Sequence, residues 1–190
     1  MKRTILVLFL LTGGLYNYVA AQNTTPLRFL IEGGLALGGD DVATVNFTNG
    51  NSQRVNAGQG ISLGVGAEYA IPSLESIRLR SSVGIKYVTT AADNAHIRLT
   101  RIPINVSGNY VFNDTWRLGL GMSFHTNIKF NAGGIGDNFT LGNASGPFIE
   151  FAYKWVGLTY TIMNYEGMLG ETYNANSIGI TFSGVLPKRN

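Results

Sequence analysis

Apolar and polar residues alternate with a period of two from about Arg28 almost to the end of the chain. Such alternation indicates β-strands with one apolar and one polar face. Apolar residues at helical spacing are nowhere sustained. The pattern predicts eight strands, at residues 28–37, 57–71, 76–89, 98–112, 116–128, 147–153, 156–165 and 176–186.

The connections between these predicted strands alternate in length. Residues 71–75, 113–115 and 154–155 are tight turns, whereas the other joins are longer and rich in Gly, Asn and Asp. An up-and-down barrel whose two rims face different compartments has short turns on one side and longer loops on the other. The sequence therefore predicts an all-β, eight-stranded antiparallel up-and-down barrel with both termini at the short-turn rim.

The composition of the two faces indicates which one looks outward. The polar face consists of Gly, Ser, Thr and Asn with few charges, which is a poor surface for contact with water. The apolar face is dense, and aromatic residues gather at the strand ends: Tyr69, Tyr110, Phe112, Trp116, Tyr153 and Trp155 by the short turns, and Tyr87 and Phe124 toward the other rim. This distribution favours a transmembrane barrel with its apolar face in lipid. The alternative is a soluble, lipocalin-like barrel with the apolar face turned inward.

The overall composition excludes several other classes of protein. Charged residues make up 13% of the chain, there are 25 glycines, and cysteine is absent. These values argue against a disordered protein and a disulfide-stapled module. No apolar run approaches the length of a membrane-spanning helix. The basic residues are scattered, so the sequence gives no reason to expect nucleic-acid binding.

The N-terminus has the organisation of an export signal. Lys2 and Arg3 precede the apolar run 5–11, and Ala20 and Ala21 supply the small residues that a secretory peptidase requires. We expect residues 1–21 to be a signal peptide and residues 22–190 to form the barrel domain. An N-terminal membrane anchor is the alternative, although the apolar run is short for that role.

These features together resemble a known family. The chain resembles the small eight-stranded outer-membrane proteins of the OmpX type and the transmembrane domain of OmpA. Residues 101–112 (RIPINVSGNYVF) and 116–124 are similar to adjacent mid-barrel strands of the outer-membrane β-barrel domain family. The resemblance implies a location in a Gram-negative outer membrane. One departure is the C-terminus, because such proteins usually end on an aromatic residue, whereas here eight residues follow Phe182.

Charged residues on the polar face are the candidate site. An eight-stranded barrel has an interior that side chains just fill, so charges enclosed there have to pair. We expect a salt-bridged plug built from Glu32, Glu68, Glu150, Arg78, Arg80, Lys86, Arg101 and Arg117. The alternative is a narrow conduit that favours anions, since positive groups are in excess. Glycines 64, 66, 84, 119 and 121 share this face and are expected to make room for the arginines.

Enzymatic chemistry has one weak candidate. Lipid A deacylases among the small outer-membrane barrels use a His and a Ser separated by one residue, but here His125 is followed at that spacing by Asn127. No catalytic residue, cofactor or transition-metal site is therefore expected. Asp40, Asp41, Asp137 and Asn138 could hold a hard cation, but we interpret them as solvated loop residues.

The sequence thus predicts a monomeric, non-enzymatic outer-membrane protein that is structural or mediates interactions through its extracellular loops. Its expected partners are outer-membrane lipid, the outer-membrane assembly machinery and an unnamed surface ligand. Residues 40–54 and 131–143 would form the variable outer surface. A small anion-favouring channel or carrier is the second hypothesis, and a lipid A-modifying enzyme is the third.

Overall fold

The computed structural model describes residues 26–46, 52–89, 97–134, 136–167 and 170–187. The expected signal peptide at 1–21 lies outside this part of the chain. Within the described part, no helix is long and apolar enough to cross a membrane.

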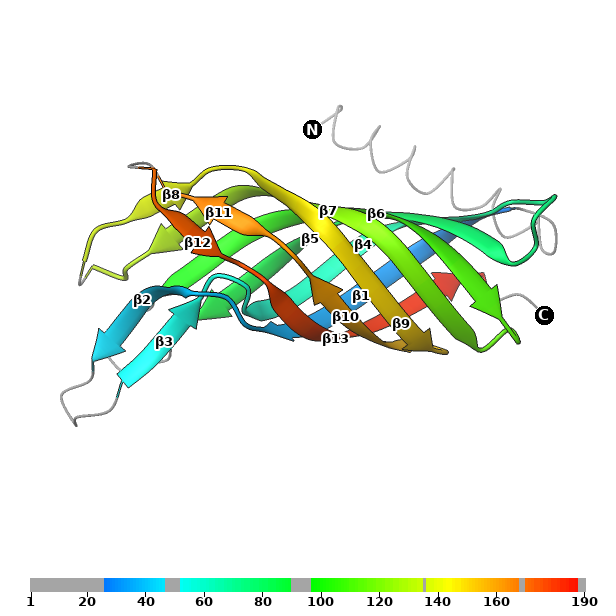
Figure 1. Cartoon of the computed structure of the whole chain (residues 1–190), viewed down its shortest axis with the longest axis horizontal. Coiled ribbons are helices and arrows are strands. Elements are labelled where there is room, and N and C mark those ends of the chain that lie inside the picture. The colour runs from blue at the N-terminus through cyan, green and yellow to red at the C-terminus, as the bar shows by residue number, and fades with distance from the viewer. Residues whose placement is uncertain (1–25, 47–51, 90–96, 135, 168–169, 188–190) are drawn as a thin grey trace, which may run out of the picture.

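Eight antiparallel strands close into a barrel (Figure 1). In chain order they are β1 (Leu27–Leu37), β4 (Gly60–Ala70), β5 (Ile77–Thr89), β6 (Arg98–Phe112), β7 (Trp116–Asn131), β9 (Ala144–Tyr153), β10 (Val156–Thr161) and β13 (Ser177–Leu186). Each strand pairs with the next, β1 pairs with β13 at the seam, and the β6–β7 and β7–β9 ladders complete the ring. Closure gives every strand two neighbours and removes free sheet edges.

The two ends of the barrel differ. At one, the short-turn end, tight turns join β4 to β5, β6 to β7 and β9 to β10. The other, the loop end, carries five additional short strands: β2 (Asp41–Asn46), β3 (Ser52–Asn56), β8 (Phe139–Leu141), β11 (Asn164–Glu166) and β12 (Thr172–Asn174). Figure 1 shows these strands together at the left, opposite the short turns. The first and last barrel strands begin and end at the short-turn end, as Phe29 pairs with Leu186.

The predicted fold class and strand number are confirmed, with changes at the strand ends. The strand expected at 57–71 begins at Gly60, the one at 116–128 continues to Asn131, and the one at 147–153 begins at Ala144. The strand expected at 156–165 ends at Thr161, and Asn164–Glu166 forms β11 in a separate hairpin with β12. The sequence analysis had left β2, β3, β8 and β12 as loop and had included most of β11 in the strand at 156–165.

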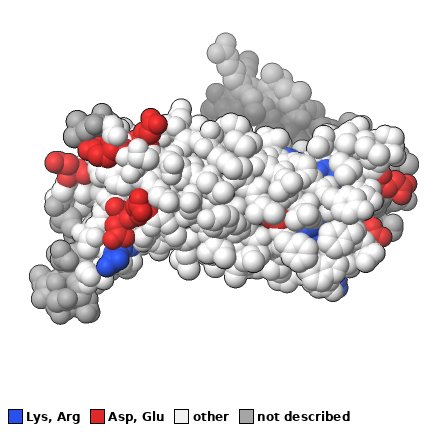
Figure 2. Space-filling view, viewed as in Figure 1, with Lys and Arg blue, Asp and Glu red and all other residues white. Residues whose placement is uncertain are grey.

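The barrel has an apolar exterior and a polar interior. Leu63 and Leu120 are 64% and 61% exposed on the outer wall, whereas Glu68 and Arg101 are 2% and 1% exposed inside. Figure 2 shows the result on one face, where a broad white band separates charged residues at the two ends. This arrangement is the reverse of a soluble barrel, and the lipocalin-like alternative is therefore wrong.

A band of aromatic rings surrounds the short-turn end of this apolar wall. The rings of Trp116 and Tyr153 are 4.7 Å apart at their centroids, and those of Trp155 and Phe182 are 5.7 Å apart. Ring contacts extend from Trp116 through Phe151 and Phe112 to Tyr110. Trp155 and Tyr153 are exposed. Such a girdle is typical of the interface between hydrocarbon and headgroups.

Glycines on the inner face serve a different purpose from the one expected. A Cβ atom at Gly84 would lie 2.5 Å from the carbonyl oxygen of Leu63 on the neighbouring strand, and one at Gly119 would lie 2.5 Å from Asn109 Oδ1. Neither space is occupied by an arginine. These glycines allow close approach of backbone and of a short polar side chain, so the expectation that they accommodate arginines is wrong at these positions.

A β-bulge near the loop end reverses the two faces of β7. There β6 contributes only Arg101 where β7 contributes both Asn127 and Ile128, and Asn127 has a φ of 53°. The extra residue shifts the side-chain alternation by one. Ile128, which the sequence pattern placed on the outer face, is consequently only 1% exposed and points inward. The sequence pattern was wrong here because a bulge leaves no break in hydrophobicity.

Between the bulge and the loop end, apolar side chains lie inside and charged side chains outside, as in a water-soluble protein. Leu99, Phe130 and Ile128 pack inside with apolar residues from the loop-end strands, while Arg98 and Lys129 are exposed outside. This apolar core, called the cap below, consists of Val55, Ala57, Val88, Ile97, Leu99, Ile128, Phe130, Ala132, Leu141, Met163, Tyr165 and Ala175. The cap closes the loop end of the barrel over its polar interior.

Candidate functional site

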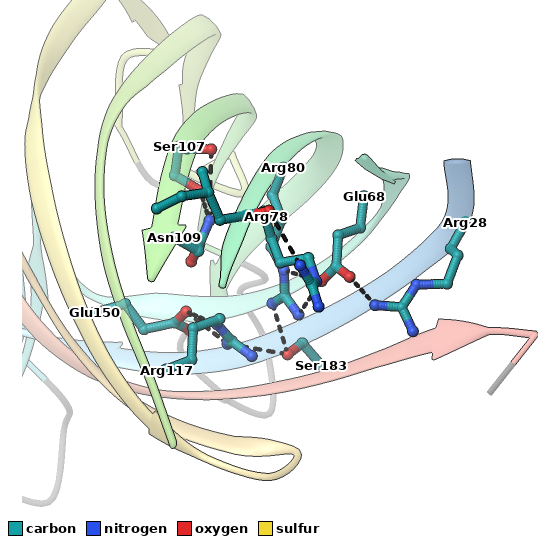
Figure 3. A network of polar contacts seen from close by, with 10 residues as sticks. Arg28, Glu68, Arg78, Arg80, Ser107, Asn109, Arg117, Glu150 and Ser183 are labelled. Carbon is teal, nitrogen blue, oxygen red and sulfur yellow. Dashed lines mark hydrogen bonds and ion pairs between the residues drawn. The ribbon is translucent and has the colours of Figure 1, made fainter. Parts of the chain in front are cut away.

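The interior nearest the short-turn end contains a carboxylate held by two guanidinium groups (Figure 3). Glu68 of β4 lies directly opposite Arg80 of β5, whose Nε and Nη2 are 2.7 and 2.6 Å from Glu68 Oε2. Arg28 of β1 donates to the other oxygen, Oε1. Glu68 is thus bound from both neighbouring strands, and its charge is compensated within the barrel.

A second ion pair crosses the interior beside the first. Arg117 of β7 donates to Glu150 Oε2 of β9 at 3.2 Å from Nε and 2.6 Å from Nη2. Thr181 donates to Glu150 Oε1 at 2.6 Å. Ser183 Oγ accepts from Arg80 at 3.2 Å and from Arg117 at 3.3 Å, so β13 joins the two ion pairs.

This plug, meaning Arg28, Glu68, Arg80, Arg117, Glu150, Thr181 and Ser183, connects six of the barrel strands across the lumen. Its ion pairs are buried, as the exposure of the paired side chains does not exceed 15%. Burying charges is costly, but removing one partner of a buried pair costs about 3–5 kcal/mol. The arrangement therefore holds the strands in register and fills the short-turn half of the interior.

Glu32 lies apart from the plug, whereas Arg78 belongs to the network of polar contacts drawn around the plug in Figure 3. Glu32 of β1 accepts hydrogen bonds from Ser82 and, at 3.2 Å, from Asn105 Nδ2. Arg78 lies near the short-turn rim, where it donates to the carbonyl oxygens of Glu75 and, at 3.1 Å, Ile77. Glu32 thus belongs to a polar layer in mid-barrel, and Arg78 braces the turn between β4 and β5.

A cavity of about 130 Å³ occupies the middle of the lumen. Its lining includes Glu32, Arg80, Lys86, Ser123 and His125, with glycine and serine residues of β4 and β5. A cavity of roughly 10–15 Å³ is sufficient for one water molecule, so this cavity has room for several. The lumen is therefore divided into plug, cavity and cap.

Lys86 lines this cavity, and Arg101 is its direct partner in the β5–β6 ladder. Lys86 Nζ donates to the carbonyl oxygen of Gly58 at 2.7 Å, and Arg101 Nη2 donates to that of Gln59. The Arg101 guanidinium also lies over the Tyr165 ring, 5.9 Å from its centroid. Both cations therefore hold the chain segment between β3 and β4 against the barrel mouth.

His125 is enclosed at the same level and does not face the exterior. Its Nδ1 is 2.5 Å from the Tyr165 hydroxyl, and both residues are buried. Burial raises the pKa of the Tyr165 phenol, an effect that the nearby Arg101 charge opposes. The phenol is therefore neutral at physiological pH and ties the cap to β7. Nothing in this contact presents His125 to a lipid.

Three of the four loop residues considered as cation ligands have protein partners. Asp41 Oδ1 accepts from Asn56 at 2.9 Å, and Asp40 Oδ2 accepts from the Asn174 backbone at 2.8 Å. Asn138 Oδ1 accepts from the Ala132 backbone at 2.8 Å. Among the residues that the structure describes, no group of three or more His, Cys, Asp or Glu could hold a metal ion.

The structure thus places the eight predicted residues inside the barrel but distributes them over three levels. Glu68, Arg80, Arg117 and Glu150 are brought together, whereas the others separate as described. The sequence analysis missed Arg28 and Tyr165. Arg28 lies on the same face of β1 as Glu32, so the period-two alternation could have identified it. Tyr165 lies in β11, beyond the end of a barrel strand, where this alternation gives no information.

No protein-family model matches this chain, and neither does any curated protein sequence. Among solved structures, the chain is similar to Ail, the attachment invasion locus protein of Yersinia pestis, with a TM-score of 0.43 and 9% sequence identity over 83% of this chain and 97% of that one. Ail has also been solved in complex with the heparin analogue sucrose octasulfate. Neisserial surface protein A (NspA) has a TM-score of 0.44 and 13% identity over 85% of this chain and 99% of that one. Likenesses this distant carry no argument about function.

Proposed function

We propose that this chain is a non-enzymatic outer-membrane protein that is structural or mediates interactions through its loop end. The observation that carries the proposal is the inverted barrel wall, with large apolar side chains outside and charged side chains inside. A closed barrel of this kind satisfies its backbone groups without water, as lipid requires. The short turns and both termini would then face the periplasm and the cap would face the exterior.

Obstruction of the lumen supports a closed barrel over an open pore. The plug fills the short-turn half with ion pairs that join β1, β4, β5, β7, β9 and β13. The cap fills the other end with buried apolar side chains such as Leu99 and Phe130. The lumen cavity lies between these two groups of side chains. Ions would have to pass both obstructions to cross.

The loop end supports a role in interaction. Two hairpins, β2–β3 and β11–β12, lie beyond the barrel strands and are joined to each other by hydrogen bonds between Asp40 and Asn174. Their exposed charged residues include Asp41, Arg54, Glu166 and Glu171. Because the cap beneath them is packed, these hairpins present a defined surface to a partner.

Two measurements on cells and purified protein test the proposal together. Folded protein should migrate differently from heated protein in a detergent gel, and protease added to intact cells should cleave only the loop end. Protein that stays in solution without detergent, or cleavage confined to the short turns, would contradict the membrane barrel or its orientation, respectively.

The second candidate is a small anion-favouring channel or carrier. It is favoured by one observation, namely that Lys86 lines the lumen cavity and, like its ladder partner Arg101, has no ion pair with a carboxylate among the residues described. Planar-bilayer recording distinguishes the two candidates. We expect no steady conductance from the wild-type protein. A steady anion-selective conductance would contradict the closed barrel and support the channel.

A further inference from the structure

Lys86 and Arg101 form a pair of like charges inside the barrel. They are direct partners in the β5–β6 ladder and point to the same inner face. A Cβ atom at Gly60 would lie 3.3 Å from both Arg101 Nη2 and Lys86 Cγ, which shows how closely the two side chains converge. Like charges directly opposite each other in a sheet are destabilising.

The described residues leave this pair without compensation. Lys86 Nζ has a single hydrogen-bond partner, the Gly58 carbonyl, although an ammonium group has three donors. Arg101 Nε and Nη1 are buried and have no partner. Glu68 and Glu150 are engaged by Arg28, Arg80 and Arg117 in the plug.

The remaining inner acid does not supply the missing charge either. Glu32 is held by Ser82 and Asn105 and forms no ion pair in the described structure. Buried charges in proteins are normally paired or hydrogen-bonded, because an isolated one costs several kcal/mol. Two adjacent buried cations therefore call for a negative ion, and the cavity that Lys86 lines has the room for one.

We propose that the cap end of the lumen binds one monovalent inorganic anion, a chloride ion, in contact with Lys86 and with Arg101 as the second cation of the site. Glu32 lines the same cavity, so a dianion such as phosphate would meet a carboxylate at close range. A halide carries one charge and accepts hydrogen bonds from any direction, which suits an ammonium group with two free donors.

Thermal unfolding of the full-length barrel in detergent micelles tests the site. Sodium chloride is compared with sodium gluconate at equal ionic strength, for wild type, Lys86→Met and the control Arg54→Gln, whose residue is 70% exposed on β3. At a chloride concentration 100 times the Kd we expect the Tm of wild type to be roughly 5–10 °C higher than in gluconate. Arg54→Gln should keep this difference and Lys86→Met should lose it.

In gluconate, Lys86→Met should be at least as stable as wild type, since the substitution removes an uncompensated charge. Equal Tm values of wild type in the two salts would overturn the proposal. A chloride effect of the same size in Lys86→Met would also overturn it, because the effect would then arise elsewhere on the protein.

Bromide in crystals of the wild-type protein provides a readout that does not depend on any variant. An anomalous peak in contact with Lys86 Nζ is expected. A lumen without such a peak, or with a peak only at exposed surface residues, would overturn the assignment.

Discussion

At the residue scale, the interior of the barrel depends on two carboxylates, Glu68 and Glu150, that each accept hydrogen bonds from more than one side chain. Glu68 shares its two oxygens between Arg28 and Arg80, so that one acid holds three strands. A surface pair such as Arg54–Asp41, with its atoms 3.4 Å apart, is exposed to water and contributes far less. The Glu68 ion pairs and the Arg54–Asp41 pair differ more in burial than in the distance between their charged atoms.

Replacing Glu68 with Gln should therefore destabilise the protein by about 3 kcal/mol, because two buried guanidinium groups lose their counter-ion. Urea unfolding of the protein in lipid vesicles measures the change. The matched variant Arg54→Gln should cost less than about 1 kcal/mol. Equal effects of the two substitutions would show that the plug does not stabilise the barrel.

Tyr165 should ionise only above the ordinary range of a tyrosine. Its folded-state pKa is raised by burial, so its contribution to stability is complete below the ordinary value of about 10 and is lost as the pH rises through the raised value. The difference between the alkaline absorbance titrations of wild type and Tyr165→Phe isolates this group. A difference curve centred at or below pH 10 would contradict its enclosure in the cap.

At the element scale, the bulge at Asn127 determines where the outer face of the barrel changes from apolar to polar and the inner face from polar to apolar. Below it, β7 presents apolar residues outward, and above it the same strand presents Lys129 outward and Phe130 inward. A bulge of this kind is set by one residue with a positive φ rather than by a long stretch of sequence.

Replacing Asn127 with Val should consequently loosen the cap while leaving the lower barrel able to close. A β-branched residue is strongly disfavoured at the φ of 53° that Asn127 adopts. Without the bulge the alternation of β7 continues unshifted, which carries Lys129 toward the apolar interior and Phe130 toward the exterior. We expect protease to cleave the loop end of Asn127→Val faster than that of wild type, whereas Asn127→Gly, which accommodates the same φ, should remain as resistant as wild type. Equal resistance of Asn127→Val and wild type would mean that the bulge does not organise the cap.

The same element shows how far the sequence could predict the structure. Alternation and turn spacing were sufficient to place eight strands, because burial on one side of a strand leaves a period of two. The register of the β4–β5 hairpin places Glu68 opposite Arg80, a pairing that follows once the tight turn is located. Ile128 could not be placed in this way, and neither could the cap, since its contacts come from loop-end segments without periodic pattern.

At the scale of the whole molecule, the outer wall should respond to charge as a lipid-facing surface. Leu120→Arg, at a position 61% exposed in mid-strand, should destabilise the vesicle-embedded protein by about 2–4 kcal/mol. Leu74→Arg is the matched control, because Leu74 is similarly exposed but lies in the turn between β4 and β5. If both substitutions are neutral, the wall is in contact with water.

The aromatic band at the short-turn end gives the molecule an internal optical marker. The chain has two tryptophans, and both Trp116 and Trp155 belong to this band. Intrinsic tryptophan emission therefore reports on the short-turn end of the barrel alone. Quenching by lipids brominated at graded positions along their acyl chains would measure how deeply that rim sits, and emission changes during insertion would time the arrival of this end of the barrel independently of the cap.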